Sequence, residues 1–304
     1  MKEIFESTFQ SDAPPPNWPH RHASGAVTTS DLRVSTNWNV RWHVQRLGSG
    51  PVLLLLHGTG GSAHSWHHAI GSLAERCTVI AIDLPGHGFS NVAPETDADG
   101  RIYALEGMAL AVRSLLDALG VQPAVAAGHS AGAAVLVRMA LDGLLPDCRL
   151  LGFNPALVAP PAAYVSLIAP LVGVVAESPL VAAGAAWLAR STGIIPSMLA
   201  STGTALSPAD RARYELLCAR PAHCHAALSM MSRWDLPKLV RDAALLTVPL
   251  ELYGGSADRW VPYGPLADSV ASIPRAVLTR VEGAGHLIPE ERPDVVIGAV
   301  GRQL

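Results

Sequence analysis

The sequence predicts an α/β protein with a mostly parallel central sheet, helices on both faces of the sheet and an inserted helical cap. Three observations support this prediction. Short apolar runs alternate with helix-length segments in the first half of the chain, a long stretch without strands follows, and the alternation then returns. Such alternation is typical of parallel sheets, because a parallel crossover needs a connection about as long as a helix.

The first elements are an arm and a hairpin. Residues 1–32 begin with a stretch rich in proline and polar groups, which indicates an arm lying over the domain, and we expect Trp18 to anchor it. From Arg33, two short strand-like segments (33–38 and 41–46) meet at Asn39 and predict an antiparallel hairpin.

The remaining elements form the core and the cap. Continuous apolar runs predict strands buried on both faces of a parallel sheet. They lie at 52–56 and 78–82, and further strand-like segments lie at 124–127, 150–153, 248–253 and 276–281, with helices at 104–119 and from Ala131. Between residues 155 and 240 helical stretches occur without a good strand. We therefore expect a helical cap at 155–240, inserted between core segments 33–154 and 241–304.

Composition restricts the classes of partner. Only 15% of the 304 residues are charged, against roughly a quarter in an average soluble domain, and 49% are apolar, so the apolar surplus needs a large core, an apolar pocket or a membrane-facing patch. The net charge of −3 gives no basic footprint, which excludes nucleic acid as a partner.

The sequence also predicts where the protein works. Four cysteines without paired C-x-x-C spacing, and an N-terminus without an apolar run, favour a reducing, cytoplasmic setting. The uncharged segment 150–176 is broken by four prolines into pieces far shorter than the ~20 residues that a spanning helix needs. We expect a protein that is at most peripheral to a membrane.

A candidate nucleophile lies in the motif Gly128-His129-Ser130-Ala131-Gly132. A serine hydroxyl must be exposed to a carbonyl and must have a base beside it. A sharp turn between a strand and a helix exposes the serine, and small residues two positions before and after leave room for that turn. Here a strand-like run precedes the motif and a helix follows it, so we interpret Ser130 as the nucleophile of such an elbow.

Two backbone donors are expected to stabilise an oxyanion at this serine. The first is the N–H of Ala131, directly after the nucleophile. The second should come from the loop His57-Gly58-Thr59-Gly60, which ends a buried strand. We predict Thr59 as this donor, with Gly60 as the alternative.

The acid and the base should follow the serine in chain order. Asp258 lies just beyond one predicted strand and His286 just beyond the last, so we predict a Ser130–His286–Asp258 triad. Asn154 holds the alternative position for an acid, but an amide cannot stabilise an imidazolium by charge. Because residue 130 is serine rather than aspartate, epoxide and haloalkane chemistry is disfavoured, whereas acyl transfer to water and cleavage of an activated C–C bond stay open.

Other motifs are interpreted as structural. The stretch 83–90 is expected to shape the site rather than transfer protons. His64 and His68 share a face if their segment is helical, but no third ligand with suitable spacing is evident, so we predict neither a metal nor a cofactor.

The triad motifs resemble the α/β-hydrolase superfamily over about residues 33–304. A closer likeness, to the magnesium-chelatase accessory protein of bacteriochlorophyll biosynthesis, is carried by segments 17–24, 41–45, 57–66, 128–134 and 230–236. The most discriminating of these are the N-terminal Trp-Pro and the Trp-Asp-Leu at 234–236. This resemblance implies a link to magnesium tetrapyrroles and an association with magnesium chelatase or, through the cap, with a membrane surface.

Two hypotheses of different classes follow. The first is a serine esterase acting on an apolar, tetrapyrrole-related substrate, and the second is a porphyrin-binding accessory module whose triad is idle. Segment 155–199 carries only two charges, Glu177 and Arg190, which favours a flat apolar ligand. We expect Tyr164 and Trp187 to supply flat surfaces for it, and His64 or His68 a polar contact.

Overall fold

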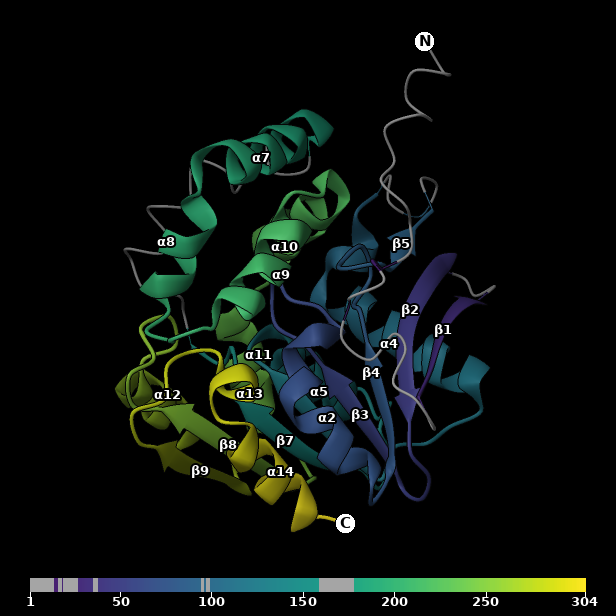
Figure 1. Ribbon diagram of the computed structural model, residues 1–304. Helices are drawn as coiled ribbons and strands as arrows, with labels where there is room; N and C mark the ends of the chain where they lie inside the picture. The colour runs from purple at the N-terminus through teal and green to yellow at the C-terminus, as the bar shows by residue number, and fades with distance from the viewer. Residues whose placement is uncertain are drawn as a thin grey trace.

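The protein forms one mixed sheet with helices on both faces and a group of helices over one edge (Figure 1). The computed structural model describes residues 14–15, 18, 27–34, 38–93, 96, 99–158 and 178–304, with the backbone alone for 27–34. The strands are β1 Val27–Val34, β2 Val40–Leu47, β3 Val52–Leu56, β4 Thr78–Ile82, β5 Asn91–Val92, β6 Val125–His129, β7 Arg149–Phe153, β8 Leu250–Gly255 and β9 Ala276–Val281.

The helices lie between these strands. They are η1 Ala63–Trp66, α2 His67–Ala74, η2 Arg101–Tyr103, α4 Leu105–Leu119, α5 Ala131–Leu141, α7 Pro179–Thr192, α8 Ile194–Ser201, α9 Pro208–Cys218, α10 Pro221–Arg233, α11 Leu236–Ala243, α12 Tyr263–Val270, α13 Ile288–Glu291 and α14 Pro293–Gly301. The strand order is β1-β2-β4-β3-β6-β7-β8-β9, with β5 beside β2. β2 pairs antiparallel with both its main neighbours, and all pairs from β4 to β9 are parallel, which confirms the predicted fold class.

The hairpin at the start of the sheet is longer than predicted. β1 begins at Val27, not at Arg33, so the last residues of the predicted arm belong to the sheet. Val27 pairs with Leu47 and Val34 with Val40, so β1 matches the whole length of β2. The prediction was wrong because residues 27–32 show only weak alternation of polar and apolar side chains. Pairing with β2, not a pattern in their own sequence, makes these residues a strand.

Alternate residues of the central strands enter two separate cores. Leu54 and Leu56 of β3 are buried with residues of α4, α5, α11 and α12, whereas Leu53 and Leu55 are buried with residues of α2 and α14. Because successive side chains of a strand point to opposite faces, a continuous apolar run is what a sheet covered on both sides requires. The apolar runs at 52–56 and 78–82 form β3 and β4 at the predicted residues. The strand-like segment 276–281 forms β9, also at the predicted residues, but β9 is not buried on both faces.

Between β7 and β8 the described chain is helical. Figure 1 shows α7 to α10 gathered over one edge of the sheet. α11 differs from them, because its Leu239 and Ala243 are buried in the core on the side of α5. The predicted cap boundary at residue 240 therefore falls inside a helix of the core. Residues 159–177 of the predicted cap, including Tyr164, lie outside the described residues.

Trp18 anchors the start of the chain, as expected. Its ring is 4% exposed and meets the rings of Phe89 and His64 edge-on, at centroid distances of 5.1 and 5.4 Å. Leu217 of α9 completes the cluster, so Trp18 contacts both the core and the cap. Among the described residues, no helix has the length and apolar character needed to cross a bilayer.

Candidate active site

Ser130 lies in a strained turn between β6 and α5. Its backbone has φ 50° and ψ −113°, a conformation that side-chain-bearing residues rarely adopt. Two close approaches make the turn possible. A Cβ on Gly128 would lie 2.4 Å from the nitrogen of Ala133, and a Cβ on Gly132 would lie 2.3 Å from the carbonyl oxygen of Leu56. The flanking glycines of the motif are therefore required by packing as well as by the turn.

The three residues of the predicted triad form one hydrogen-bonded chain. His286 Nε2 lies 3.1 Å from Ser130 Oγ, and His286 Nδ1 lies 2.8 Å from Asp258 Oδ2. Asp258 accepts two further bonds at Oδ1, from the N–H groups of Trp260 and Val261 at 2.8 and 2.9 Å. Since the carboxylate can only accept, His286 donates from Nδ1, and its Nε2 lone pair faces the serine hydroxyl.

The backbone of the His286 loop is held from several elements. Its carbonyl oxygen lies 2.8 Å from Nδ2 of Asn154 and 2.8 Å from Nε2 of His129. Asn154 also accepts the N–H of Gly255 at Oδ1, at 2.7 Å. On the cap side, Thr204 Oγ1 accepts a hydrogen bond of 2.9 Å from the N–H of Leu287. Asn154, which holds the alternative position for an acid, thus ties the ends of β7 and β8 to the histidine loop.

The loop expected to supply an oxyanion donor is fixed by two histidines. His57 donates from Nδ1 to the carbonyl oxygen of Gly58 at 2.7 Å, and its Nε2 accepts the N–H of Leu84 at 2.9 Å. His223 of α10 accepts the N–H of Gly88 at Nδ1, at 3.0 Å, so its Nε2–H donates to the carbonyl oxygen of Gly60 at 3.1 Å. A cap residue therefore helps to hold this loop.

Thr59 and Ala131 are the two predicted oxyanion donors. Thr59 lines the same cavity as Ser130. Ala131 is the first residue of α5, and an N–H in the first turn of a helix has no partner within that helix. Both backbone N–H groups are thus candidates for binding an oxyanion at Ser130.

The loop at 83–90 is organised around Asp83. This buried carboxylate accepts the N–H groups of Ala63 and Phe89, at 2.7 and 2.8 Å, and pairs with Nδ1 of His43 at 2.8 Å. Burial opposes its charge, but these partners hold the pKa of Asp83 well below its usual range. The contacts fit the shaping role that we expected of this loop.

A cavity opens in front of Ser130 and is lined by core and cap. The core supplies Gly58, Thr59, Gly60, Gly61, Ser65, His129, Ser130, Trp260, His286 and Leu287, and the cap supplies Met198, Leu199, Thr202 and Tyr214. Two expectations about its walls were wrong. Trp187 is 60% exposed on α7, and His64 is fully buried with its Nδ1 on Ser62 Oγ. Within the described part of the chain, the tryptophan and tyrosine at the cavity wall are Trp260 and Tyr214. His68 instead faces Asp210.

Tyr214 at the cavity wall is hydrogen-bonded to Glu290, a pair that the sequence did not predict. The hydroxyl of Tyr214 donates to Glu290 Oε1 at 2.5 Å, and Ser65 Oγ lies 3.5 Å from the same hydroxyl. Burial raises the pKa of Glu290 to about 8, so this carboxyl group is protonated at neutral pH. The two residues are 76 positions apart and belong to no motif, so no sequence signal joins them.

Residues 53–299 match the family model described as "Alpha/beta hydrolase family". The chain belongs to that family. It is 36% identical over 288 residues to the magnesium-chelatase 30 kDa subunit of Rhodobacter capsulatus, covering 94% of this chain and 96% of that protein. This relative supports the closer resemblance inferred from the motifs.

Other members of the family carry hydrolase names. The soluble epoxide hydrolase of Corynebacterium sp. (strain C12) is 28% identical over 274 residues, covering 84% of this chain and 91% of that one. Among solved structures, a thermophilic esterase from Thermogutta terrifontis superposes with a TM-score of 0.67 at 20% identity, over 90% of this chain and 97% of that chain. An α/β-hydrolase fold protein from Burkholderia ambifaria gives 0.70 at 23%, over 90% and 99%. The chain is a hydrolase of this family in general terms, and the two superpositions establish the fold alone.

The buried histidines around the site predict a loss of stability in acid. Burial lowers the pKa of His129 to about 3 and that of His223 to about 4, and it also lowers the pKa values of His57, His64, His67 and His87. The unfolded chain, with ordinary histidines, binds more protons below pH 6.5, so stability falls as pH falls through that value. At pH 5 the loss is about 2 kcal/mol for each of His129 and His223. Urea unfolding at pH 7 and pH 5 measures it.

Glu290 provides the control for this prediction. Burial raises the pKa of Glu290 from 4.5 to about 8, so between these values the folded protein binds a proton that the unfolded chain does not. As pH falls from 7 to 5, Glu290 therefore increases the free energy of unfolding by about 1.4 kcal/mol per pH unit, which opposes the effect of the histidines. The variant Glu290→Gln should therefore lose stability more steeply in acid than the wild type. A free energy of unfolding that stays level or rises in the wild type from pH 7 to pH 5 contradicts the prediction.

Proposed function

We propose that the chain is a serine hydrolase of the carboxylic ester class, with Ser130 as nucleophile, His286 as general base and Asp258 as the acid of the triad. The observation that carries the proposal is the hydrogen-bonded chain itself. The bonds to Asp258 place the Nδ1 proton of His286, so Nε2 is free to accept the proton of Ser130 Oγ at 3.1 Å. Nothing in the packing of an α/β core requires this trio.

The steps follow from these positions. Ser130 Oγ attacks the ester carbonyl while its proton moves to His286 Nε2, and the charge on the imidazolium is stabilised by Asp258. The N–H groups of Thr59 and Ala131 bind the negative oxygen that forms on the former carbonyl. His286 then returns the proton to the departing alcohol, and water repeats the sequence on the acyl-serine to release the acid.

The identity of residue 130 argues for acyl transfer. Although one relative is named as an epoxide hydrolase, residue 130 of this chain is serine rather than aspartate, which disfavours epoxide opening here. Acyl transfer to water is the reaction that a serine, a neutral histidine and two backbone donors together assist. Cleavage of an activated C–C bond would use the same groups.

The proposed substrate is apolar and related to magnesium tetrapyrroles. Two observations support this part of the proposal. Met198, Leu199, Leu287 and Trp260 give the cavity apolar walls around few polar groups. The near full-length relative is named as a magnesium-chelatase subunit. An exposed apolar surface on α7, with Leu180 83% and Trp187 60% exposed, further supports contact of the cap with the chelatase or a membrane surface.

The second candidate is a porphyrin-binding accessory module in which the triad is not used. Only the name of the same relative favours it, because a subunit of a chelatase need not hydrolyse anything. The two candidates differ in whether Ser130 reacts. A serine-directed fluorophosphonate should label Ser130 if the protein is a hydrolase and leave it unlabelled if the triad is idle.

Replacement of the nucleophile tests the main proposal. Wild-type protein should hydrolyse a small activated ester such as p-nitrophenyl acetate and form a phosphonate adduct, and Ser130→Ala should abolish both. The loss of kcat should be about 10⁴-fold or more, because the triad acts as a unit. Ser130→Ala turnover equal to that of the wild type, with labelling at the same site, would refute the assignment.

The acid of the triad is tested by a pair of variants. Asp258→Asn should keep the fold and lose most esterase activity, since an amide cannot stabilise the imidazolium. Asn154→Ala removes bonds to the His286 carbonyl and to Gly255, so it should lower stability by about 1–3 kcal/mol and reduce kcat much less. Kinetics and urea unfolding of both variants measure this. The reverse order of damage to kcat would show that the acid is misassigned.

Titration with protoporphyrin or its magnesium complex tests the substrate class. We expect saturable binding at micromolar or better affinity, about 8 kcal/mol, with a shift of the Soret band and quenching of tryptophan fluorescence. Trp260 lies at the cavity wall, so Trp260→Phe should remove part of the quenching. Efficient turnover of small esters without saturable porphyrin binding would leave a general carboxylesterase.

A further inference from the structure

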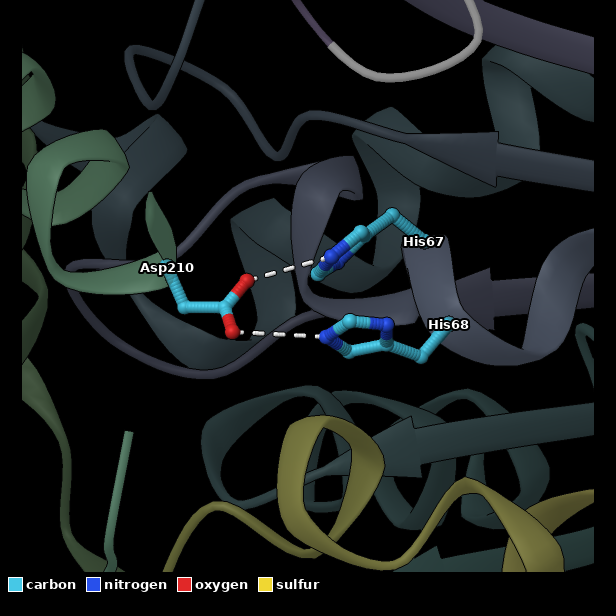
Figure 2. A group of neighbouring side chains, drawn as sticks. All are labelled: His67, His68 and Asp210. Atoms are coloured by element: carbon cyan, nitrogen blue, oxygen red, sulfur yellow. Dashed lines mark hydrogen bonds and ion pairs between the residues drawn. The ribbon is translucent and has the colours of Figure 1, made fainter. Parts of the chain in front are cut away.

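Two histidines of the core face one carboxylate of the cap, away from Ser130. His67 and His68 begin α2, which follows the oxyanion loop and η1, and Asp210 lies in the first turn of α9. Figure 2 shows the two rings pointing at the carboxylate from one side. His67 Nε2 lies 3.1 Å from Asp210 Oδ1, and His68 Nε2 lies 3.3 Å from Oδ2. All three ligand atoms lie within 4.8 Å of one another.

The protonation of His67 makes this contact unusual. Its Nδ1–H donates to the carbonyl oxygen of His64 at 2.7 Å, so its Nε2 presents a lone pair. His67 Nε2 also lies 3.0 Å from Nη1 of Arg213, which can only donate, so Nε2 accepts and the ring is neutral. Two acceptors, Nε2 of His67 and Oδ1 of Asp210, therefore face each other at 3.1 Å. Such an arrangement needs a positive charge beside both.

In the structure that charge is the guanidinium of Arg213. Its Nη1 lies 3.0 Å from His67 Nε2 and also contacts Asp210 Oδ1. Arg213 is one turn further along α9, and its side chain is 21% exposed, so part of it reaches solvent. A positively charged group therefore lies against both His67 Nε2 and Asp210 Oδ1 in the structure.

The spacing of the ligand atoms suits a small transition-metal ion. Zinc binds histidine nitrogen and carboxylate oxygen at about 2.0–2.2 Å, so neighbouring ligands of a tetrahedral site lie about 3.3 Å apart. His67 Nε2 and His68 Nε2 lie 3.1 and 3.3 Å from Asp210, each at a different carboxylate oxygen, and the three ligand atoms lie within 4.8 Å of one another. Outer bonds of the kind found at metal sites are also present, from His67 Nδ1–H to the His64 carbonyl and from Ser207 Oγ to Asp210 Oδ2 at 2.6 Å.

We propose that His67, His68 and Asp210 form a zinc site that competes with Arg213, and that bound zinc fastens cap helix α9 to core helix α2. Water completes the coordination. The ion does not touch Ser130 and takes no part in the chemistry. It holds α9, and with it Tyr214, which follows Arg213 in the chain and lines the cavity. The sequence analysis missed this site because Asp210 is 142 positions from His68.

Calorimetric titration of the full-length apo protein with Zn²⁺ tests the proposal. We expect one zinc ion per chain, and no comparable binding of Mg²⁺, which prefers oxygen ligands. His67→Ala and Asp210→Asn should each weaken binding at least about tenfold. Arg213→Ala removes the competing cation and should tighten binding by about tenfold, with Arg213→Gln as a second variant if the first folds poorly. His225→Ala, on α10, is the matched control and should bind zinc as the wild type does.

A spectroscopic readout makes the test independent of esterase activity. Cobalt(II) in a tetrahedral site of nitrogen and oxygen ligands absorbs visible light, and this absorption should appear in wild type and Arg213→Ala and vanish in Asp210→Asn. The proposal is overturned if neither wild type nor Arg213→Ala binds zinc, or if His67→Ala and Asp210→Asn bind it as tightly as the wild type.

Discussion

The strained backbone of Ser130 is the constraint on which the site depends. At φ 50° the residue is held only because Gly128 and Gly132 let the chain pass within contact distance of Ala133 and Leu56. The buried strands β3 and β6 supply the rigid support that such strain requires, since they pair in parallel at the centre of the sheet. The same carboxyl edge receives the loops after β8 and β9, so one sheet edge collects the serine, the carboxylate and the histidine.

The cap is part of the site rather than a lid beside it. His223 of α10 donates to the oxyanion loop at Gly60, and Thr204, between α8 and α9, accepts the N–H of Leu287. A Cβ on Gly285 would meet Thr204 Oγ1 at 2.4 Å, which shows how closely the cap linker packs on the histidine loop. A displacement of the cap would therefore disturb both the candidate oxyanion donors and the proposed base. Any event that fastens α9 to the core would also act on the geometry of the proposed active site.

The sequence predicted an element well where the residues of that one segment are enough to determine its structure. The apolar runs of β3 and β4 must be strands buried on two faces, and the turn at Ser130 needs its glycines, so both are readable from a few adjacent residues. β1 was misjudged because its structure comes from pairing with β2, and the cap boundary was misjudged because α11 is helical on either side of it. Trp187 was misplaced since a large aromatic residue on a helix can face either the cavity or solvent.

By itself the sequence determined the fold class, the order of the motifs along the chain and the candidate triad, because parallel strands bring the residues that follow them to one edge. Tertiary structure alone decided which distant side chains meet there. Asn154 became a support for His286, Glu290 acquired a protonated state against Tyr214, and Asp210 came to face two histidines of the core. The physical reason is that these contacts arise between elements far apart in the chain, where burial and geometry set protonation and partners, and neither leaves a local pattern in the sequence.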